Sequence, residues 1–141
     1  MTEILVNVKI YLAVIGGLIM AALGGCDKLL LILACFVVVD YISGVVLAIK
    51  QGKLNSRTGF IGLLKKAMIF LVVIIAHLLD ELTGIDAIRS MTVFFYISNE
   101  GISIVENLGK LDVKIPQKLK DVLEQLEDKQ DDNKEDTESD N

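Results

Sequence analysis

The stretch that decides the fold is residues 29–49, LLLILACFVVVDYISGVVLAI. A bilayer core of about 30 Å requires about 20 predominantly apolar residues in a helix. This stretch has 21 residues, and Asp40 is its only charged residue. Its Leu, Ile, Phe and Val residues contribute about −6 kcal/mol to membrane insertion, whereas a central Asp costs about 3 kcal/mol. The stretch is therefore predicted to cross a membrane in spite of Asp40.

Three further apolar stretches extend the pattern, at about 4–25, 60–80 and 87–108. The first is interrupted only by Asn7 and Lys9, and it lacks the basic start of a cleaved signal peptide. The last is the weakest, because Asn99 and Glu100 near its centre cancel the gain from its apolar residues. The sequence thus predicts an all-α membrane protein with about four transmembrane helices in residues 1–109.

The rest of the chain has a different composition. Residues 1–109 carry eight acidic and eight basic side chains, whereas 110–141 carry eleven and six. Residues 110–126 are predicted to contain a short amphipathic helix that begins at Pro116, with one apolar face formed by Leu119, Val122, Leu123 and Leu126. Residues 127–141 contain no apolar residue and are predicted to form a disordered acidic tail.

The orientation follows from the lysines and arginines of the short loops. The loop between the second and third stretches contains Lys50, Lys53 and Arg57, whereas the loop between the third and fourth is net acidic. The basic loop is expected to face the cytoplasm. With four spans, both termini of this multi-pass protein would then lie on the cytoplasmic side of the membrane.

Several classes of function find no support in the sequence. There is one histidine, His77, and no HExxH motif, CxxC motif or glycine-rich phosphate loop. No catalytic residue, metal site or cofactor is therefore predicted. A nucleic-acid partner is not expected, because no basic stripe exists outside residues 50–66. Cys26 and Cys35 would lie about 13 Å apart on a straight helix, too far for a disulfide, and Cys35 is expected to be buried.

Polar residues at membrane depth are the candidate functional residues, because they are costly there and usually face a bundle interior or water. Thr92 begins a polar stripe along the fourth stretch, which suits the wall of an aqueous lesion. The alternative is a satisfied polar contact between helices, and both interpretations remain open at this point. The candidate pore-lining or bundle-interior residues are Asp40, Ser43, Lys66, His77, Tyr96, Glu100, Ser103 and Asn107.

Small residues recur every four positions in the first stretch. Close backbone approach through small residues drives helix association in lipid. The sequence therefore predicts helix packing and a homo-oligomer in the lipid bilayer. The predicted helix-packing residues are Ala13, Gly17, Ala21 and Gly25, continued in the second stretch by Gly44 and Ala48.

Two regions resemble a known family. Residues 40–70 resemble the Asp-x-x-[ST]-Gly…Ser-x-x-Gly-x-x-Gly-x-x-x-Lys-Lys region of the phage holins grouped with clostridial toxin-secretion holins. Residues 94–126 resemble that family's Asn-Glu-x-x-Ser-x-x-Glu-Asn segment, which precedes a helix that begins at proline. The matching positions are Asp40, Ser43, Gly44, Ser56, Gly59, Gly62, Lys65, Lys66, Asn99, Glu100, Ser103, Glu106, Asn107 and Pro116.

The resemblance implies a protein that collects in the cytoplasmic membrane and permeabilises it, so that an endolysin reaches the cell wall and the cell lyses. An endolysin is then a functional partner without direct contact. Export of a large toxin is the alternative within the same mechanical class. A small-ion or drug transporter and a passive membrane scaffold with a recruiting tail are alternatives from other classes.

Overall fold

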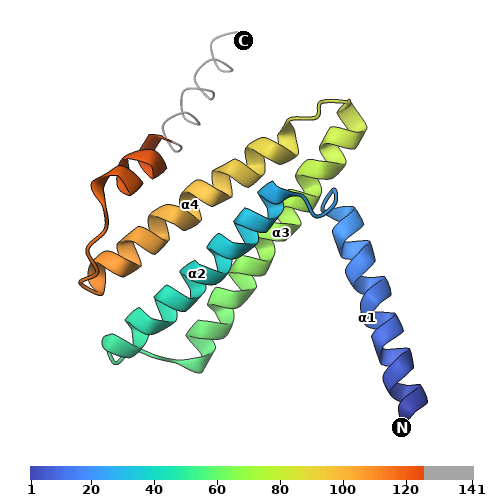
Figure 1. Cartoon of the computed structure of the whole chain (residues 1–141), viewed down its shortest axis with the longest axis horizontal. Helices are drawn as coiled ribbons and strands as arrows, with labels where there is room; N and C mark the ends of the chain where they lie inside the picture. Colours follow the sequence, from blue (N-terminus) through green and yellow to red (C-terminus); the bar gives the residue numbers. More distant parts are fainter. Residues whose placement is uncertain (126–141) are drawn as a thin grey trace.

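The computed structural model describes residues 1–125, and that part of the chain is helical with no strand (Figure 1). The helices are α1 (Thr2–Ala22), α2 (Lys28–Lys50), α3 (Ser56–Thr83) and α4 (Ile88–Lys110). A short helical segment follows over residues 117–125. The all-α prediction is confirmed, whereas the predicted acidic tail at 127–141 lies outside the described residues.

The ends of α3 follow the local sequence signals. The Asn55 side chain accepts a hydrogen bond from the Arg57 backbone N–H at 2.9 Å, which is the usual role of an N-cap residue. At the other end, Gly84 adopts a left-handed conformation with φ 71°, where glycine has no Cβ penalty. Both ends of α3 therefore follow from residues next to the helix in the sequence.

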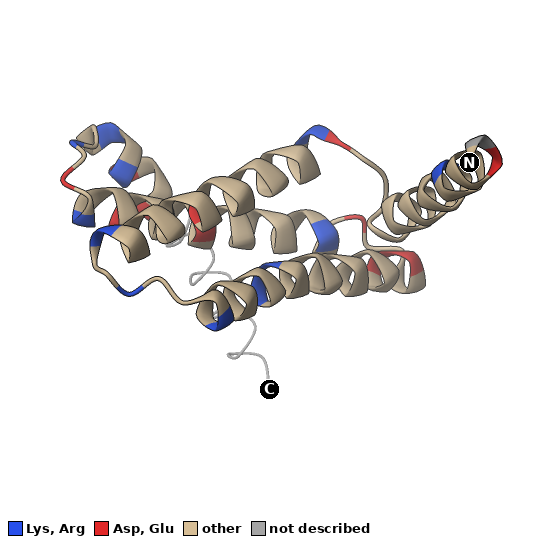
Figure 2. Ribbon diagram, turned by 90° about the horizontal axis from the view of Figure 1, so that it is seen from below, with Lys and Arg blue, Asp and Glu red and all other residues tan. Residues whose placement is uncertain are grey.

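Helices α2, α3 and α4 form a bundle in which α4 packs against both of the others (Figure 1). Each helix contributes one fully buried apolar side chain to the centre of the core: Leu33, Val73 and Val93. The outer faces carry many large exposed apolar residues, and the charged residues gather mainly near the helix ends (Figure 2). An apolar exterior of this extent is typical of a surface that faces lipid. Cys35 belongs to it, so the prediction that Cys35 is buried was wrong.

Three helices are long and apolar enough to cross a membrane: α1 from Glu3 to Ala22, α2 and α3. α4 is not among them, because it carries Arg89, Glu100 and Glu106 in addition to Lys110 at its end. It nevertheless has 23 residues, as α2 does, and lies beside α2 in the bundle (Figure 1). At 1.5 Å per residue both helices extend about 34 Å. The structure thus supports three of the four predicted spans by composition and places the fourth helix alongside them.

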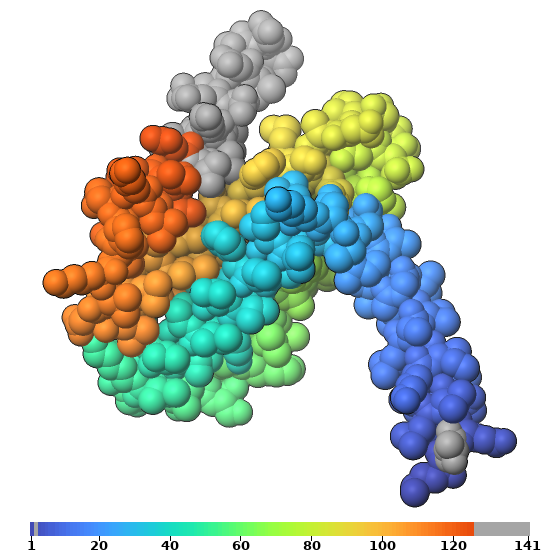
Figure 3. All heavy atoms as spheres, in the orientation of Figure 1, coloured from blue at the N-terminus to red at the C-terminus, as the bar shows by residue number. Residues whose placement is uncertain are grey.

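α1 stands apart from the bundle (Figures 1 and 3). All its side chains from Glu3 to Ala21 are exposed. The helix ends at Ala22, because Gly24 and Gly25 adopt φ values of 81° and 93°, which favour glycine and interrupt the helix. Gly25 therefore lies in the loop, and its predicted place in the helix-one groove was wrong.

The segment over residues 117–125 folds back along α4 (Figure 1). Leu123 is buried against Gly101, where an added Cβ would lie 2.5 Å from a Leu123 methyl carbon and 3.1 Å from the Phe36 ring. Val122 and Leu123 follow Leu119 by three and four residues in this helical segment, so the three share one face as predicted, but only Leu123 is buried, and Leu119 and Val122 are exposed. Leu126, the last residue of that predicted face, lies outside the described residues. Gly101 is thus the point where the segment approaches α4 closely.

Candidate functional site

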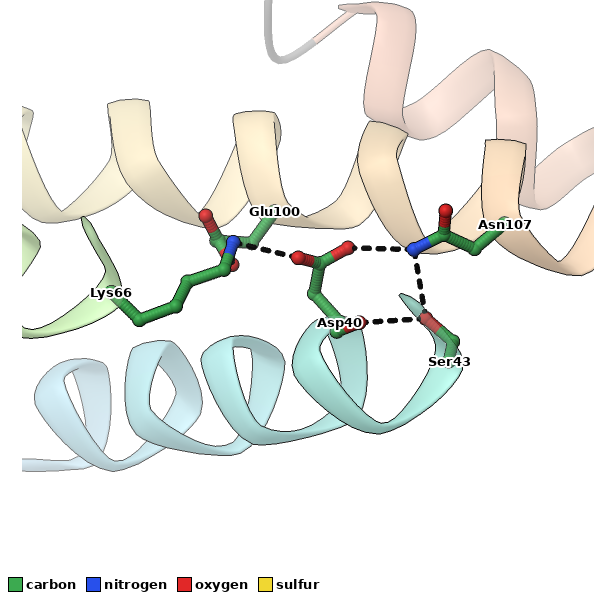
Figure 4. A network of polar contacts seen from close by, with 5 residues as sticks. All are labelled: Asp40, Ser43, Lys66, Glu100 and Asn107. Carbon is green, nitrogen blue, oxygen red and sulfur yellow. Dashed lines mark hydrogen bonds and ion pairs between the residues drawn. The ribbon is translucent and has the colours of Figure 1, made fainter. Parts of the chain in front are cut away.

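An ion-pair cluster joins the three bundle helices at their middle (Figure 4). Lys66 of α3 places its Nζ 2.6 Å from Asp40 Oδ2 and 2.5 Å from Glu100 Oε2. Asp40 is the thirteenth of 23 residues in α2, and Glu100 is the thirteenth of 23 in α4. A single ammonium group therefore bridges two carboxylates at the depth where charge is most costly in a membrane.

Two further side chains complete the cluster (Figure 4). The Asn107 amide Nδ2 donates to Asp40 Oδ1 and to Ser43 Oγ, both at 3.1 Å. Ser43 Oγ in turn donates to the Asp40 backbone carbonyl at 3.0 Å. Both carboxylate oxygens of Asp40 thus have a partner, which offsets the cost of removing this carboxylate from water.

The charges of the cluster do not balance. The side chains of Asp40 and Glu100 are 8% and 7% exposed and that of Lys66 is 19% exposed, so all three are shielded from solvent. With all three ionised, two negative charges face one positive charge. Removal of one partner from a buried ion pair typically costs 3–5 kcal/mol, because it leaves a buried charge uncompensated. Loss of Lys66 is therefore expected to destabilise the bundle, and the cluster contains two carboxylates for one ammonium group.

The other predicted pore or bundle residues lie outside this cluster. His77 of α3 lies near the α1–α2 loop, where its Nδ1 is 2.9 Å from the position that a Cβ on Gly24 would occupy. Tyr96 packs against the apolar core and makes an edge-to-face contact with Phe95 at 5.2 Å between ring centroids. Ser103 is half-buried on α4. The structure therefore brings together Asp40, Ser43, Lys66, Glu100 and Asn107, and leaves His77, Tyr96 and Ser103 apart from them.

A second polar cluster, which the sequence did not predict, surrounds Arg89 at the end of the bundle near the α1–α2 loop. The Arg89 guanidinium donates to the Leu23 carbonyl and to Asp27 Oδ2, each at 2.6 Å, and to the Gly25 carbonyl at 3.4 Å. The side chain of Asp80 caps the start of α4, since it accepts from the backbone N–H of Arg89 at 2.9 Å. A buried arginine must find acceptors, and the carbonyls of Leu23 and Gly25 and the Asp27 carboxylate supply them here. No signal in the sequence indicated that Arg89 would be buried.

The electrostatics of this second cluster are clear at Asp27, which lies in the loop before α2. The hydrogen bond from Arg89 lowers the pKa of the Asp27 carboxyl below its ordinary value, and the hydrogen bond from the Leu30 N–H lowers it further. The same carboxylate caps α2 through that Leu30 contact, at 2.8 Å. Asp27 therefore fixes the start of α2 and, through Arg89, the direction in which α1 leaves the bundle.

The basic end of the bundle is closed by Lys50. Its Nζ lies 2.6 Å from Asp112 Oδ2 and donates to the Lys110 carbonyl at 3.1 Å. The nearby ammonium group lowers the pKa of Asp112, which is fully exposed. The contact joins the last turn of α2 to the turn that follows α4.

The predicted helix-packing residues fall into two groups. Ala13, Gly17 and Ala21 are exposed on α1, which touches the described bundle only slightly, at α3, so their role in self-association stays a prediction. Gly44 and Ala48 of α2 instead line a cavity of about 210 Å³ between α2 and α3. An added Cβ on Gly44 would lie 3.7 Å from Asn107 Nδ2, so this glycine packs beside the central cluster.

Comparison with known proteins adds to this geometry. The sequence model of the bacteriophage holin family matches residues 17–128. A probable holin of Bacillus phage phi105 is 42% identical over 91 residues, which cover 64% of this chain and 67% of that protein. An uncharacterised 14.9 kDa protein of Clostridium perfringens is 39% identical over 131 residues, 92% of this chain and 99% of that protein.

An uncharacterised protein of Listeria monocytogenes is 42% identical over 101 residues, which cover 71% of this chain and 72% of its own length. No solved structure matches. The family match covers the ion-pair cluster, the three bundle helices and the whole described segment after α4. The chain therefore belongs to the bacteriophage holin family.

Proposed function

We propose that this protein assembles into a homo-oligomer in the bacterial cytoplasmic membrane and permeabilises it, so that an endolysin reaches the cell wall. The observation that carries this proposal is the Asp40–Lys66–Glu100 cluster, which holds α4 against two strongly apolar helices. Membership of the holin family supports the same role. We propose in addition that α4 crosses the membrane with α1, α2 and α3, and that both termini lie in the cytoplasm.

The energetics of α4 explain how such a protein could have a closed and an open state. Its eight Leu, Ile, Phe and Val residues between Thr92 and Gly109 contribute about −3.5 kcal/mol to insertion, and one central carboxylate cancels most of this gain. In the closed bundle, Lys66 compensates Glu100. In an open oligomer, water would solvate both groups and remove the need for the pair. The cluster would thus stabilise the closed bundle in lipid without excluding a water-filled arrangement.

The segment over residues 117–125 requires a rearrangement under this proposal. Its docking on α4 at Gly101 would hold the charged residues Lys120 and Glu124 alongside the second half of α4. Charged side chains are excluded from lipid. We therefore propose that this segment leaves α4 in the inserted protein and lies at the cytoplasmic surface.

The substitution Glu100→Leu tests the proposal. It leaves a neutral Asp40–Lys66 pair and removes the carboxylate that opposes insertion, so it should favour the closed, lipid-embedded state by up to about 3 kcal/mol. We expect a protein that accumulates normally but permeabilises late or never. Membrane potential and culture turbidity after induced expression measure the effect, with immunoblots to equalise membrane levels.

Phe94→Leu is the matched control, because Phe94 is an exposed apolar residue of the same helix. It should leave the lysis time almost unchanged. If Glu100→Leu lyses cells on the wild-type schedule, the cluster is only a structural contact.

Export of a large toxin is the second candidate, favoured by the resemblance of residues 40–70 to the phage holins grouped with clostridial toxin-secretion holins. Co-expression with a cytoplasmic endolysin or with a large reporter protein separates the two.

A further inference from the structure

The cavity between α2 and α3 leads from the exposed residues 53–58, which comprise the end of the α2–α3 loop and the first turn of α3, to the ion-pair cluster. Its walls near the loop carry Lys53 and Thr58, both exposed. Its sides are lined by small residues, including Gly44, Ala48, Gly59 and Gly62, and Asp40 and Lys66 line its inner end. The cavity exists because α2 and α3 pack on α4 and hardly touch one another. The cluster, with its two carboxylates and one ammonium group, is therefore reachable from outside the bundle through this cavity.

Lys9 of α1 has no ion-pair partner in the described part of the chain, and the same holds for Lys28 at the start of α2 and for Lys65 of α3. Of these three lysines, only Lys9 lies on the helix that stands apart from the bundle. Lys9 lies on α1 in register with Leu5 and Ala13, at spacings of four residues, so the three share one face. All three are exposed. A lysine within a membrane-spanning helix needs a carboxylate or an interface position, and the bundle has one carboxylate in excess.

Lys9 and the Asp40–Lys66–Glu100 cluster lie at similar depths in the membrane if the N-terminus and the α2–α3 loop are on the same membrane face. At 1.5 Å per residue, Lys9 lies about 10 Å from the start of α1 at Thr2, and Asp40 lies about 15 Å from the end of α2 at Lys50. The long, flexible side chain of Lys9 can span this difference in depth of about 5 Å. The Glu3 carboxylate would lie near the membrane surface, beside the basic Lys53 and Arg57.

We propose that the N-terminal half of α1 packs across this cavity on a second copy of the chain, with Lys9 beside the Asp40–Lys66–Glu100 cluster. A second copy is favoured over the same chain because Arg89 holds the loop carbonyls of Leu23 and Gly25, which directs α1 away from its own bundle (Figure 1). The cavity accommodates side chains rather than a helix backbone, so Leu5 and Lys9 would project into it. This inference rests on the proposed oligomeric function and names the contact that builds the oligomer.

Cysteine cross-linking between two differently tagged chains tests the contact. In a background with Cys26→Ser and Cys35→Ser, one chain carries Leu5→Cys and the other carries Thr58→Cys. We expect oxidation in membranes to give a disulfide-linked heterodimer. Asn7→Cys is the matched control, because it lies at the same depth on the opposite face of α1 and should cross-link at least five-fold less. Equal yields from both positions would overturn the contact.

A chain with both Leu5→Cys and Thr58→Cys shows whether α1 contacts the cavity of its own chain or that of a second copy. If only an intrachain disulfide forms and mixed tags never cross-link, α1 occupies its own bundle and the proposal is wrong. When Lys9→Met is added to the Leu5→Cys chain, the yield of the heterodimer with the Thr58→Cys chain should fall several-fold. The same substitution should have little further effect when combined with Glu100→Gln, because the cluster then has no excess charge. A loss that is equal in both backgrounds would overturn the charge argument.

The outcome separates this inference from the proposed function. Absence of every cross-link in a protein that still depolarises cells would refute the α1 contact and leave membrane permeabilisation standing. A heterodimer in a protein that never depolarises cells would support the contact and refute permeabilisation.

Discussion

α1 and the α2–α4 bundle are both apolar, but they treat their polar residues in opposite ways. In the bundle, Asp40, Lys66 and Glu100 face inward and form ion pairs across three helices (Figure 4). In α1, Asn7 and Lys9 are exposed, and α1 stands apart from the described bundle helices (Figure 3). The bundle thus pairs its central polar side chains internally, whereas those of α1 need water, lipid headgroups or another molecule as partners.

The α1–α2 loop holds α1 apart from the bundle. Leu23 is buried, and its carbonyl and that of Gly25 accept hydrogen bonds from Arg89 at the start of α4. An added Cβ on Gly24 would lie 2.8 Å from Arg89 Nε, so a larger residue there would disrupt the contact. The chain is therefore tightly anchored at the point where α1 leaves the bundle, and α1 itself is free of the bundle along nearly its whole length.

Among the substitutions that test this difference between the bundle and α1, Lys66→Met is expected to have the largest effect on stability. The substitution leaves Asp40 and Glu100 together without a cation, at a cost of about 3–5 kcal/mol. We predict that the bundle no longer forms stably and that the protein level in the membrane falls several-fold. Lys65→Met is the control, since Lys65 is exposed and contacts no cluster residue. Immunoblots of membrane fractions provide the measurement, and equal levels of both variants would show that the bundle does not depend on its ion pairs.

An intermediate effect concerns the segment over residues 117–125. If it leaves α4 in the inserted protein, a cysteine at Leu123 should react with maleimide in inside-out membrane vesicles as fast as a cysteine at Val122. In the described structure Leu123 is 6% exposed and Val122 is 52% exposed. The rates are measured in the background without Cys26 and Cys35. Protection of Leu123→Cys alone, by ten-fold or more, would mean that the segment stays docked in the membrane.

The smallest effect is expected from Asp27→Asn. Asparagine keeps the cap of α2 but removes the charge that pairs with Arg89. Because Arg89 lowers the pKa of Asp27 in the folded protein, the ion pair stabilises the fold above the ordinary value of 3.8 and is lost as the pH falls through the lowered pKa. The Asp27 side chain is 47% exposed, so the loss at pH 7 should be below about 1 kcal/mol.

Thermal unfolding in detergent at pH 7 and at pH 3 measures this contribution. The variant should be less stable than wild type at pH 7, and the difference should shrink at pH 3. A difference that grows on acidification would contradict the role of the Asp27–Arg89 pair.

The sequence predicted the helices well because their signals are local. Apolar length, the Asn55 cap and the Gly84 stop each act within a few residues. It also marked Asp40, Lys66 and Glu100 as important, because charge in an apolar stretch is conspicuous. It could not show that Lys66 contacts both carboxylates while His77 lies elsewhere, since helix rotation and pairing depend on packing between distant segments. Arg89 was missed because, in a loop region, its position looked solvent-exposed, and only the fold surrounds it with carbonyls.

The central claim is that α4 crosses the membrane beside α2 and α3, paired with them at mid-depth. Single cysteines at Asp86, in the α3–α4 loop, and at Lys114, after α4, test it in the background without Cys26 and Cys35. An impermeant maleimide applied to intact cells should label Asp86→Cys, whereas Lys114→Cys should react only after permeabilisation. Labelling of both positions from outside would mean that α4 remains on the external face, and would contradict the four-helix membrane arrangement.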